Sequence, residues 1–582
     1  MRQEGLTSYD NHPAALDRGL RNHLKRQPLL RSDMLFINLL VIVWLLSWYP
    51  RREGSLDLRW DGSVYYVLGT SLAQGTGYRL LNEPGGINAV QYPPMLPAII
   101  AVHQKIAGTD DPFIVGTWLK LSWALCSAFV VAGAYVFSRK FLPPLWARLA
   151  ALLYVFNLPM YLHFNMLSAE VPFTVALIAF FLANPGSGSI RSEITAGIAA
   201  LTAFLSRTAG LVLFVAWIGD AVLKKQFRRA AMRSAIAVFC VFPWYAYIHW
   251  VESSPEYRQP AYAYQRADYL YSNVSYANNM AYIDPYRPER GMVSRSDLLQ
   301  RVIGNAIQIP AVIGETITSY RSFWVAQSMF LNNLVKLPLL PPKAVDVLLI
   351  TLGCLALGGI AVLGVYGQWL IVLYVLATLG LVCTTPWPLQ HVRYLSPSTA
   401  IFLLGLCTAL YKAQHIFPRR FPALRRGVYS VSVCLIALML LEQIATYHQA
   451  HARYLTSLDI ADKTGKPVIY KQLFYHVDSV AMDECITWIA KHANKNDIVS
   501  ASMAHWVYLR TGLKAVIPPL ELDAATANEL FATVPVRYVI RESPGFFSSR
   551  YVANAVQSEP GKWRQVYVAN AADVRVYERV VN

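Results

Sequence analysis

Long apolar runs separated by short polar stretches dominate the chain up to about residue 446. An apolar run of about 20 residues can cross a hydrocarbon core about 30 Å thick as a helix. The pattern therefore predicts an α-helical polytopic membrane protein with about eleven spanning helices. We expect them near residues 34–49, 113–137, 147–161, 167–183, 194–205, 210–223, 235–250, 345–365, 369–383, 397–411 and 428–444.

The basic residues gather in short clusters between these runs, where the positive-inside rule places cytoplasmic loops. Residues 1–33 are too long and too interrupted for a signal-peptide n-region, so they are expected to be a cytoplasmic tail before a retained first span. Counted from that tail, the loops that should be cytoplasmic carry Arg139, Lys140, Arg191, Lys224, Lys225, Arg228, Arg229, Arg233, Arg419, Arg420, Arg425 and Arg426. The agreement holds in four of five loops, the short uncharged turn near residues 365–367 being uninformative, and it favours a membrane protein with a cytoplasmic N-terminus.

Three regions are left on the outer side: external loops at 50–111 and 251–343, and a C-terminal region at 447–582. The C-terminal region alternates helix-like stretches, such as 482–493 and 524–533, with short strand-like runs, such as 536–540. We predict a transmembrane domain over 34–446 followed by a small extracytoplasmic α/β domain.

Composition supports the membrane class and excludes others. Of 582 residues, 55% are hydrophobic and only 15% charged, and the mean hydropathy is +0.33. The net charge of +17 does not indicate a nucleic-acid partner, because the basic residues lie in loop clusters and form no patch with interleaved aromatics. Six of the seven cysteines lie in or beside apolar runs, which fits neither a disulfide framework nor a thiolate metal site.

Asp61 is the first candidate for catalysis. It lies about a dozen residues beyond the first span, where a carboxylate stays near the interface. We expect an amphipathic interfacial helix over 63–73 that places Tyr65 and Tyr66 beside the acid. The structural alternative is that Asp61 caps this helix, and the local sequence leaves both readings open.

Glu170 is the second candidate, at the outer end of a predicted span and inside an apolar run. An ionisable group there is costly unless it faces a polar cavity. The alternative is an ordinary acid in the first turn of a helix that Ser168 caps. We favour function because Asp61 and Glu170 face the same side of the membrane, where the pair would also suit a divalent cation. His163 precedes this run and is expected to be an interfacial residue.

Arg207 and Arg393 are also predicted on the outer side, where the positive-inside rule does not explain them. Each invites an anionic partner, either a lipid phosphate or one of the acids. Snorkelling to ordinary headgroups is the alternative. Since Arg393 stands beside His391 and Tyr394, we interpret it as a phosphate-binding residue.

The external segment 256–301 is rich in tyrosine. Tyrosines favour membrane interfaces, so this segment could lie on lipid headgroups. A flap over a substrate cavity is the functional reading, and the sequence does not separate the two.

Taken together, these motifs resemble those of GT-C membrane glycosyltransferases. The chain is similar to the bacterial branch that contains lipid A aminoarabinose transferases and relatives of protein O-mannosyltransferases. The resemblance covers roughly residues 33–411 and rests on the external acid Asp61, Gly75-Thr76-Gly77-Tyr78, Tyr92-Pro93-Pro94, Ser168-x-Glu170, the Arg-x-x-Gly at 207–210 and the Arg-Tyr-Leu-x-Pro at 393–397.

The resemblance implies a sugar donor carried on a polyprenyl phosphate and transfer to a lipid, glycan or protein hydroxyl at the outer face. Asp61 then matches the general base and Glu170 the second-loop acid. Arg393 matches the residue that holds the lipid phosphate. Residues expected to support substrate or phosphate binding are Arg207, Tyr65, Tyr66, Tyr92, His391 and Tyr394.

Two departures qualify the resemblance. The first loop has a single Asp where protein mannosyltransferases tend to have an Asp-Glu pair. The C-terminal region lacks a Trp-Trp-Asp motif, which argues against an oligosaccharyltransferase.

A donor phosphate is already a good leaving group, so one base and cationic stabilisation suffice for direct displacement with inversion. A divalent cation is not required by this chemistry. The competing function is a transporter or flippase, and a third is a receptor that binds through its C-terminal domain. Against transport, the candidate polar groups lie at one membrane face rather than at the midplane.

Overall fold

The computed structural model describes residues 29–183, 189–336, 341–415, 421–461 and 465–580. Each predicted span is helical in it, but the span expected at 147–161 is divided into two helices, Pro144–Val155 and Leu158–His163. The corresponding helices are α2 (Arg31–Trp48), α5 (Pro112–Arg139), α6 (Pro144–Val155), α8 (Glu170–Leu182), α9 (Ile190–Ser206), α10 (Leu211–Leu223), α11 (Phe227–Glu252), α16 (Pro342–Val365), α17 (Trp369–Cys383), α19 (Thr399–Ala413) and α20 (Pro422–Tyr454). Among the described residues, six helices are long and apolar enough to cross a membrane, and shorter apolar helices accompany them. The protein is therefore a polytopic α-helical membrane protein.

The segment expected as an external loop at 251–343 differs from a loop in its second half. It contains α14 (Arg295–Ile317) and α15 (Arg321–Val335), and α14 packs along α16 and α17. The close approach of α14 to α16 depends on a glycine in α16, because a Cβ at Gly353 would lie 1.9 Å from the Pro310 carbonyl oxygen of α14. The polar residues within α14, such as Asn305, interrupt its apolar pattern and explain why hydropathy misses the helix.

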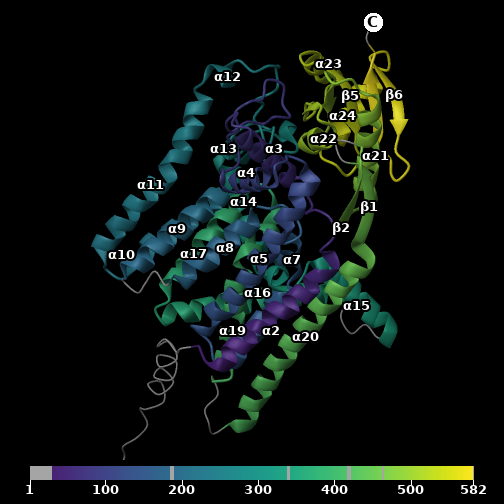
Figure 1. Ribbon diagram of the computed structural model, residues 1–582. Helices are drawn as coiled ribbons and strands as arrows, with labels where there is room; N and C mark the ends of the chain where they lie inside the picture. The colour runs from purple at the N-terminus through teal and green to yellow at the C-terminus, as the bar shows by residue number, and fades with distance from the viewer. Residues whose placement is uncertain (1–28, 184–188, 337–340, 416–420, 462–464, 581–582) are drawn as a thin grey trace, which may run out of the picture.

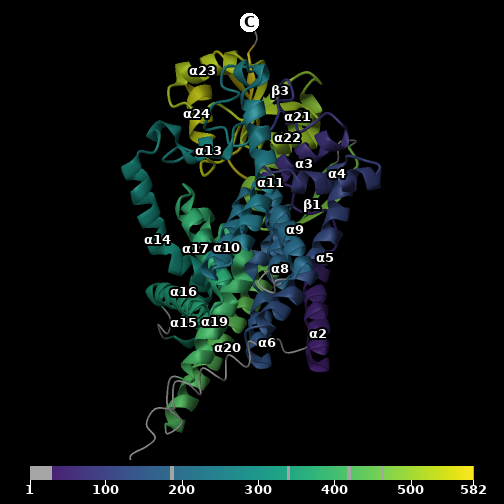
Figure 2. The same cartoon turned by 90° about the vertical axis from the view of Figure 1, so that its left-hand side faces the viewer.

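The bundle has two unlike ends (Figures 1 and 2). The start of α2 lies at one end, and the C-terminal strands lie at the other, together with α3 (Asp61–Ala73), α4 (Met95–Ala107), α12 (Pro255–Arg258) and α13 (Tyr276–Met280). Two basic residues taken as topology signals are buried in ion pairs: Arg233 with Glu193 at 2.7 Å and Arg139 with Asp33 at 3.5 Å. Most of the predicted tail, residues 1–28, and Arg419 and Arg420 lie outside the described residues.

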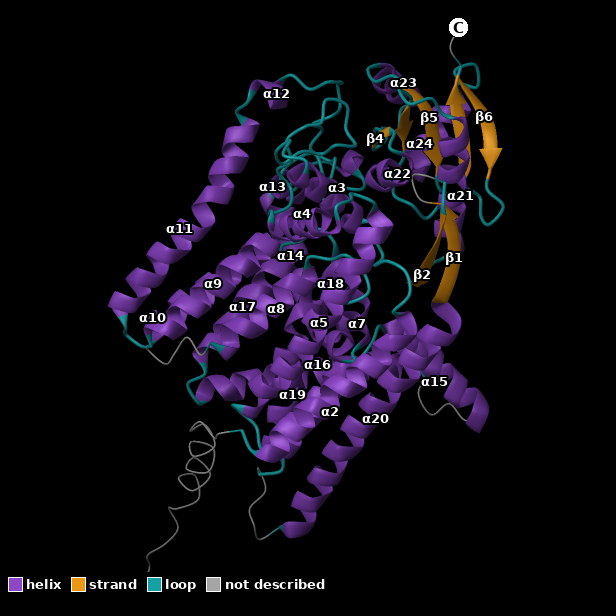
Figure 3. Ribbon diagram, in the orientation of Figure 1, coloured by secondary structure: helices purple, strands orange, loops and turns teal. Residues whose placement is uncertain are grey.

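The C-terminal region forms the predicted small α/β domain, and all strands gather there (Figure 3). An antiparallel pair of strands, β1 (Leu455–Ala461) and β2 (Pro467–Leu473), follows α20 directly. The second sheet has the order β4-β3-β5-β7-β6, in which β3 is parallel to both of its neighbours and the β5–β7 and β6–β7 pairs are antiparallel. Its strands are β3 (Ile498–Ser500), β4 (Lys514–Val516), β5 (Val536–Arg541), β6 (Trp563–Val568) and β7 (Arg575–Arg579), and its helices are α21 (Val477–His492), α22 (Ala504–Thr511), α23 (Ala524–Ala532) and α24 (Ser549–Ser558).

The helix that follows Asp61 is not the amphipathic interfacial helix that the sequence predicts. Nearly every residue of α3 is buried, because the helix packs against α4 on one side and α22 of the C-terminal domain on another. The local sequence of residues 50–111 does not reveal these contacts. The C-terminal domain covers part of α3 through α22.

Candidate active site

Asp61 is the first residue of α3, and its carboxylate does not cap the helix. Trp60 occupies the N-cap position and makes no side-chain cap hydrogen bond. Instead, the Tyr92 hydroxyl donates to Asp61 Oδ1 at 3.1 Å, and Arg393 Nη2 donates to Asp61 Oδ2 at 2.5 Å. The alternative that Asp61 caps the helix is therefore wrong. The Asp61 carboxylate instead contacts one charged and one aromatic side chain.

The turn before Asp61 is stabilised by a buried, forked ion pair between the side chains of Arg59 and Asp57. Arg59 donates to Asp57 through Nε at 3.0 Å and Nη2 at 2.7 Å. The hydroxyl of Tyr470, on β2, donates to Asp57 Oδ1 at 3.2 Å and accepts from the Leu58 backbone N–H at 3.1 Å. A charge-assisted, bidentate pair of this kind fixes local geometry.

Glycine at position 62 brings the start of α3 close to the segment that leads into α8. A Cβ on Gly62 would lie 3.0 Å from the carbonyl oxygen of Leu167, tighter than ordinary van der Waals contact. Leu167 in turn donates its backbone N–H to the Asp57 carbonyl oxygen at 2.8 Å. The close approach places Asp61 beside Glu170, the first residue of α8.

Glu170 is fully buried at the start of α8, and Ser168 does not cap this helix, because the N-cap is Ala169. Its Oε1 accepts from Arg207 Nη1 at 2.5 Å and from Arg393 Nε at 2.6 Å. Its Oε2 is buried and has no hydrogen-bond donor among the described residues. The carboxylate thus holds two arginines at one point.

Arg393 bridges the two acids from α18 (His391–Leu395). The Arg207 guanidinium carbon lies 5.3 Å from the Tyr394 ring centroid, within cation–π range. Two guanidinium groups therefore balance two carboxylates. Three of the four side chains are partly exposed: Arg393 is 28% exposed, Arg207 20% and Asp61 17%. The side chain of Glu170 is 0% exposed.

An aromatic wall stands beside these charges. The ring centroids of Tyr65 and Tyr92 lie 4.7 Å apart, and those of Tyr92 and Tyr271 lie 6.1 Å apart. Trp387 extends this row of aromatic side chains, and its ring centroid lies 6.0 Å from that of Tyr271 and 5.5 Å from that of Tyr276. The sequence pointed to the tyrosine-rich segment but not to Trp387, and the structure packs this segment against the charge cluster.

Two residues expected at the site do not reach it. The Tyr66 hydroxyl donates to the carbonyl oxygen of Asp110 at 3.1 Å, on the loop before α5. His391 is fully buried, its Nε2 lies 3.2 Å from Thr385 Oγ1, and its ring centroid is 6.5 Å from that of Tyr394. Helical geometry explains both differences, because neighbouring residues of a helix point in different directions.

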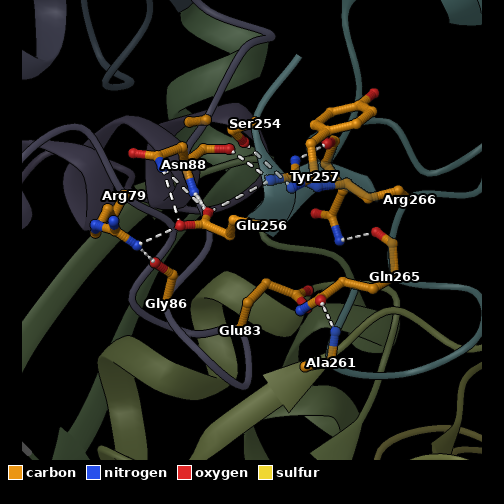
Figure 4. Close-up of polar contacts among 12 residues, drawn as sticks. Arg79, Glu83, Gly86, Asn88, Ser254, Glu256, Tyr257, Ala261, Gln265 and Arg266 are labelled. Atoms are coloured by element: carbon orange, nitrogen blue, oxygen red, sulfur yellow. Dashed lines mark hydrogen bonds and ion pairs between the residues drawn. The ribbon is translucent and has the colours of Figure 1, made fainter. Parts of the chain in front are cut away.

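Polar contacts made by Glu256 and Arg266, called the polar clasp below, hold the loop that leads to Tyr92 (Figure 4). Glu256, on α12, accepts from the Asn88 backbone N–H at 2.7 Å and from Arg79 Nη1 at 3.1 Å. Arg266 Nη2 donates to the Asn88 carbonyl oxygen at 2.9 Å. The tyrosine-rich segment and the first external loop are therefore fastened together just before Tyr92.

Another buried acid, Glu83, lies close to this clasp (Figure 4). Glu83 Oε2 accepts from the Tyr262 hydroxyl at 2.8 Å and from Gln265 Nε2 at 3.0 Å. Burial raises the pKa of Glu83 above its ordinary value. Isolated acids in a loop form no sequence pattern, so neither Glu83 nor Glu256 is predictable from the sequence alone.

The acids of the site do not offer a divalent cation two free carboxylates. Arg393 lies between Asp61 and Glu170, and both Asp61 oxygens have donors. Within the described ranges, no group of three or more His, Cys, Asp or Glu residues is arranged to hold a metal ion. A cation at this place would compete with the Arg393 guanidinium for the two carboxylates.

No protein-family model matches the chain, and no curated protein matches it. Among solved structures, it is similar to the Archaeoglobus fulgidus oligosaccharyltransferase tethered to an acceptor peptide containing the NVT sequon, with TM-score 0.50 and 13% identity over 94% of this chain and 74% of that one. The apo form of that protein gives TM-score 0.50 and 12% identity over 87% and 69%. ArnT from Cupriavidus metallidurans bound to undecaprenyl phosphate gives TM-score 0.38 and 12% identity over 94% and 98%. The likeness to the oligosaccharyltransferase concerns the fold alone, and it agrees with the predicted fold class of a polytopic helical membrane protein with a small C-terminal α/β domain.

Proposed function

We propose that this chain is an integral membrane glycosyltransferase that moves a sugar from a polyprenyl-phosphate donor to an acceptor hydroxyl, by direct displacement with inversion. The observation that carries the proposal is the position of Arg393, whose guanidinium joins Asp61 and Glu170 at the end of the bundle that carries the C-terminal domain. The same site thus holds a carboxylate for proton transfer and cations for a phosphate.

Arg393 and Arg207 are proposed to bind the donor phosphate. Both are partly exposed, and a guanidinium has five N–H donors, of which Arg393 uses those on Nε and Nη2 for the two acids. Planar guanidinium groups bind phosphate oxygens well, and they stabilise the negative charge that grows on the leaving phosphate. Glu170 is proposed to keep both arginines in place, since it is buried and touches each of them.

Asp61 is proposed to be the general base. It takes the proton from the acceptor hydroxyl while that oxygen forms a bond to the anomeric carbon of the donor sugar. The bond between the anomeric carbon and the phosphate oxygen breaks, and its electron pair leaves with the phosphate. The products are the inverted glycoside, a polyprenyl phosphate and a protonated Asp61. A hydroxyl on a lipid, glycan or protein suits the same base, so the acceptor is identified by experiment.

The polyprenyl chain is proposed to lie in the lipid beside the bundle, and the acceptor to approach from the C-terminal domain. We place the protein in a bacterial cytoplasmic membrane with this domain outside, in line with the basic loops. Mass spectrometry of lipid-linked sugars and surface glycans in a deletion strain would identify both substrates.

The test is donor-dependent transfer by the purified full-length protein in nanodiscs, with radiolabelled polyprenyl-phosphate sugars and a lipid and glycan extract as acceptor source. Transfer by the wild type that Asp61→Asn abolishes would support the proposal. Transfer by Asp61→Asn at the wild-type rate would refute the base assignment. In sealed proteoliposomes, movement of the intact lipid-linked sugar between leaflets without bond cleavage would instead indicate a flippase.

A further inference from the structure

Trp60, directly before Asp61, has a backbone conformation that a residue with a side chain rarely adopts. Its φ is 59° and its ψ is −133°. The mirror image of these angles is an ordinary extended conformation, so glycine reaches them freely, whereas an L residue is strained there. Such strain persists only where surrounding contacts hold it.

The contact that faces Trp60 comes from the C-terminal domain. Trp60 is 46% exposed as a residue, and its ring stacks on Phe546 with centroids 5.7 Å apart and planes 11° apart. Phe546 lies in the loop between β5 and α24. Thus an aromatic pair joins the residue before Asp61 to a loop more than 480 positions later in the chain.

The conformation of Trp60 sets the direction of α3. On its N-terminal side, Arg59 is locked by the fork with Asp57. On its C-terminal side, Ser63 donates its hydroxyl to the Trp60 carbonyl oxygen at 2.7 Å and its backbone N–H at 3.2 Å. A rotation at Trp60 would therefore turn the first helical residue, Asp61, relative to the fixed turn before it.

The same loop of the C-terminal domain also touches the tyrosine-rich segment. Phe547 packs on Tyr286 with centroids 4.9 Å apart. From α24, which follows this loop directly, Arg550 Nη2 donates to Glu289 Oε1 at 2.6 Å, and the Tyr551 hydroxyl donates to Glu289 Oε2 at 2.7 Å. These contacts anchor the loop independently of Trp60, so it provides a firm support for the stack.

We infer that Phe546 is a positioning residue for Asp61: its stack on Trp60 holds the strained turn that aims the carboxylate at Tyr92 and Arg393. This inference rests on the proposed function, and it assigns the C-terminal domain a part in the site. Loss of the stack lowers the share of molecules with the strained turn, and hence kcat, by about tenfold, equivalent to about 1.4 kcal/mol.

The kinetic test is a double-mutant cycle in full-length protein in nanodiscs. Phe546→Ala is expected to lower kcat about tenfold with an unchanged KM for the polyprenyl-phosphate sugar donor. Trp60→Gly adopts the same backbone angles without strain, so it should keep kcat within about twofold, and Phe546→Ala in that background should cost less than about twofold. An equal loss from Phe546→Ala in both backgrounds would overturn the inference. A tenfold loss of kcat in the single variant Trp60→Gly would overturn the inference too, and it would show that the indole itself is needed.

The matched control is Tyr567→Ala, which removes a similar stack within the same domain, at 5.7 Å and 17° from Trp488. It should leave kcat unchanged, and an equal loss there would show that any stack in the domain matters. Phe546→Leu serves as a second variant if Phe546→Ala fails to elute as a monodisperse protein.

A spectroscopic readout separates this inference from the proposed function. Protein labelled with 5-fluorotryptophan gives a ¹⁹F resonance for Trp60 that is assigned by its absence in Trp60→Phe. Phe546→Ala should shift this resonance, and Tyr567→Ala should not. A Trp60 resonance that Phe546→Ala leaves unchanged overturns the inference whatever the activity. Absence of transfer by the wild type, with the resonance shift present, refutes the proposed function and leaves the stack established.

Discussion

Arg393 Nη2 lies 2.5 Å from Asp61 Oδ2, and this ion pair joins positions 332 residues apart in the chain. The same guanidinium reaches buried Glu170 through Nε at 2.6 Å. Arg393 therefore joins the start of α3 to the start of α8 through two ion pairs. Both carboxylate oxygens of Asp61 therefore accept hydrogen bonds, and its side chain is partly exposed.

Asp61→Asn is expected to lower sugar transfer by about 10²–10⁴-fold, the usual contribution of a general base. The variant should fold, because asparagine keeps an oxygen that can accept from Tyr92 or Arg393. Transfer rate and the midpoint of thermal unfolding are the two measurements. Asp110→Asn is the control, since Asp110 is an exposed acid of the same loop.

Tyr92→Phe removes the hydroxyl that donates to Asp61 Oδ1 at 3.1 Å. A hydrogen bond to a charged group contributes about 1.5–3 kcal/mol, so kcat should fall by roughly tenfold or more. Tyr66→Phe is the matched control, because its hydroxyl donates to the Asp110 carbonyl oxygen and not to the site. Equal effects of the two variants on kcat would contradict a role for Tyr92 in holding the base.

Glu170→Gln leaves Arg207 and Arg393 side by side with one carboxylate fewer. Removing one partner of a buried ion pair costs about 3–5 kcal/mol, and a clear drop in the thermal unfolding midpoint is expected. Glu170→Gln combined with Arg207→Gln should recover part of that loss, because the unpaired charge is gone. Additive losses would show that the pair is not coupled. Glu529→Gln, at an exposed position of α23, is the control.

Glu542, just after β5, makes the stability of the C-terminal domain depend on pH. It is fully buried and accepts from the Ser502 backbone N–H at 3.0 Å and from the Ser548 hydroxyl at 2.9 Å. Burial raises the pKa of Glu542 to about 7, from an ordinary value of 4.5. Between these two pH values the unfolded chain releases its proton and the folded chain keeps it, so the free energy of unfolding falls as pH rises.

The fall amounts to at most about 3 kcal/mol and is complete above pH ~7. Glu542→Gln stays neutral, so it should be more stable than the wild type at pH ~8 and similar to it near pH ~4.5. Thermal unfolding of the full chain at these two pH values measures the difference. An equal offset at both pH values would indicate that Glu542 does not carry the proton.

Chelation of divalent cations is expected to leave the transfer rate unchanged, because the Arg393 guanidinium already lies between the two acids and supplies the positive charge. The measurement compares turnover in EDTA with turnover in added Mg²⁺ or Mn²⁺. Loss of turnover in EDTA that a divalent cation restores would show that a metal ion replaces Arg393 between the carboxylates during the reaction.

The sequence alone predicted the helical membrane class, the positions of the apolar helices and the C-terminal α/β domain. These features depend on hydropathy and on local periodicity, which are properties of neighbouring residues. It missed α14 and α15, since polar residues along α14 are tolerated where it packs against α16. It also assigned Tyr66 and His391 to the site from proximity in sequence, although their side chains turn elsewhere.

Only the tertiary structure decided how the charged residues meet. The sequence predicted Asp61, Glu170, Arg207 and Arg393 on one face, but not that Arg393 contacts both acids, because that depends on how α3, α8, α9 and α18 pack together. It likewise gave no sign of Phe546, since a stack on Trp60 exists only when the C-terminal domain lies over the first external loop. Contacts between distant segments follow from packing, which no local pattern encodes.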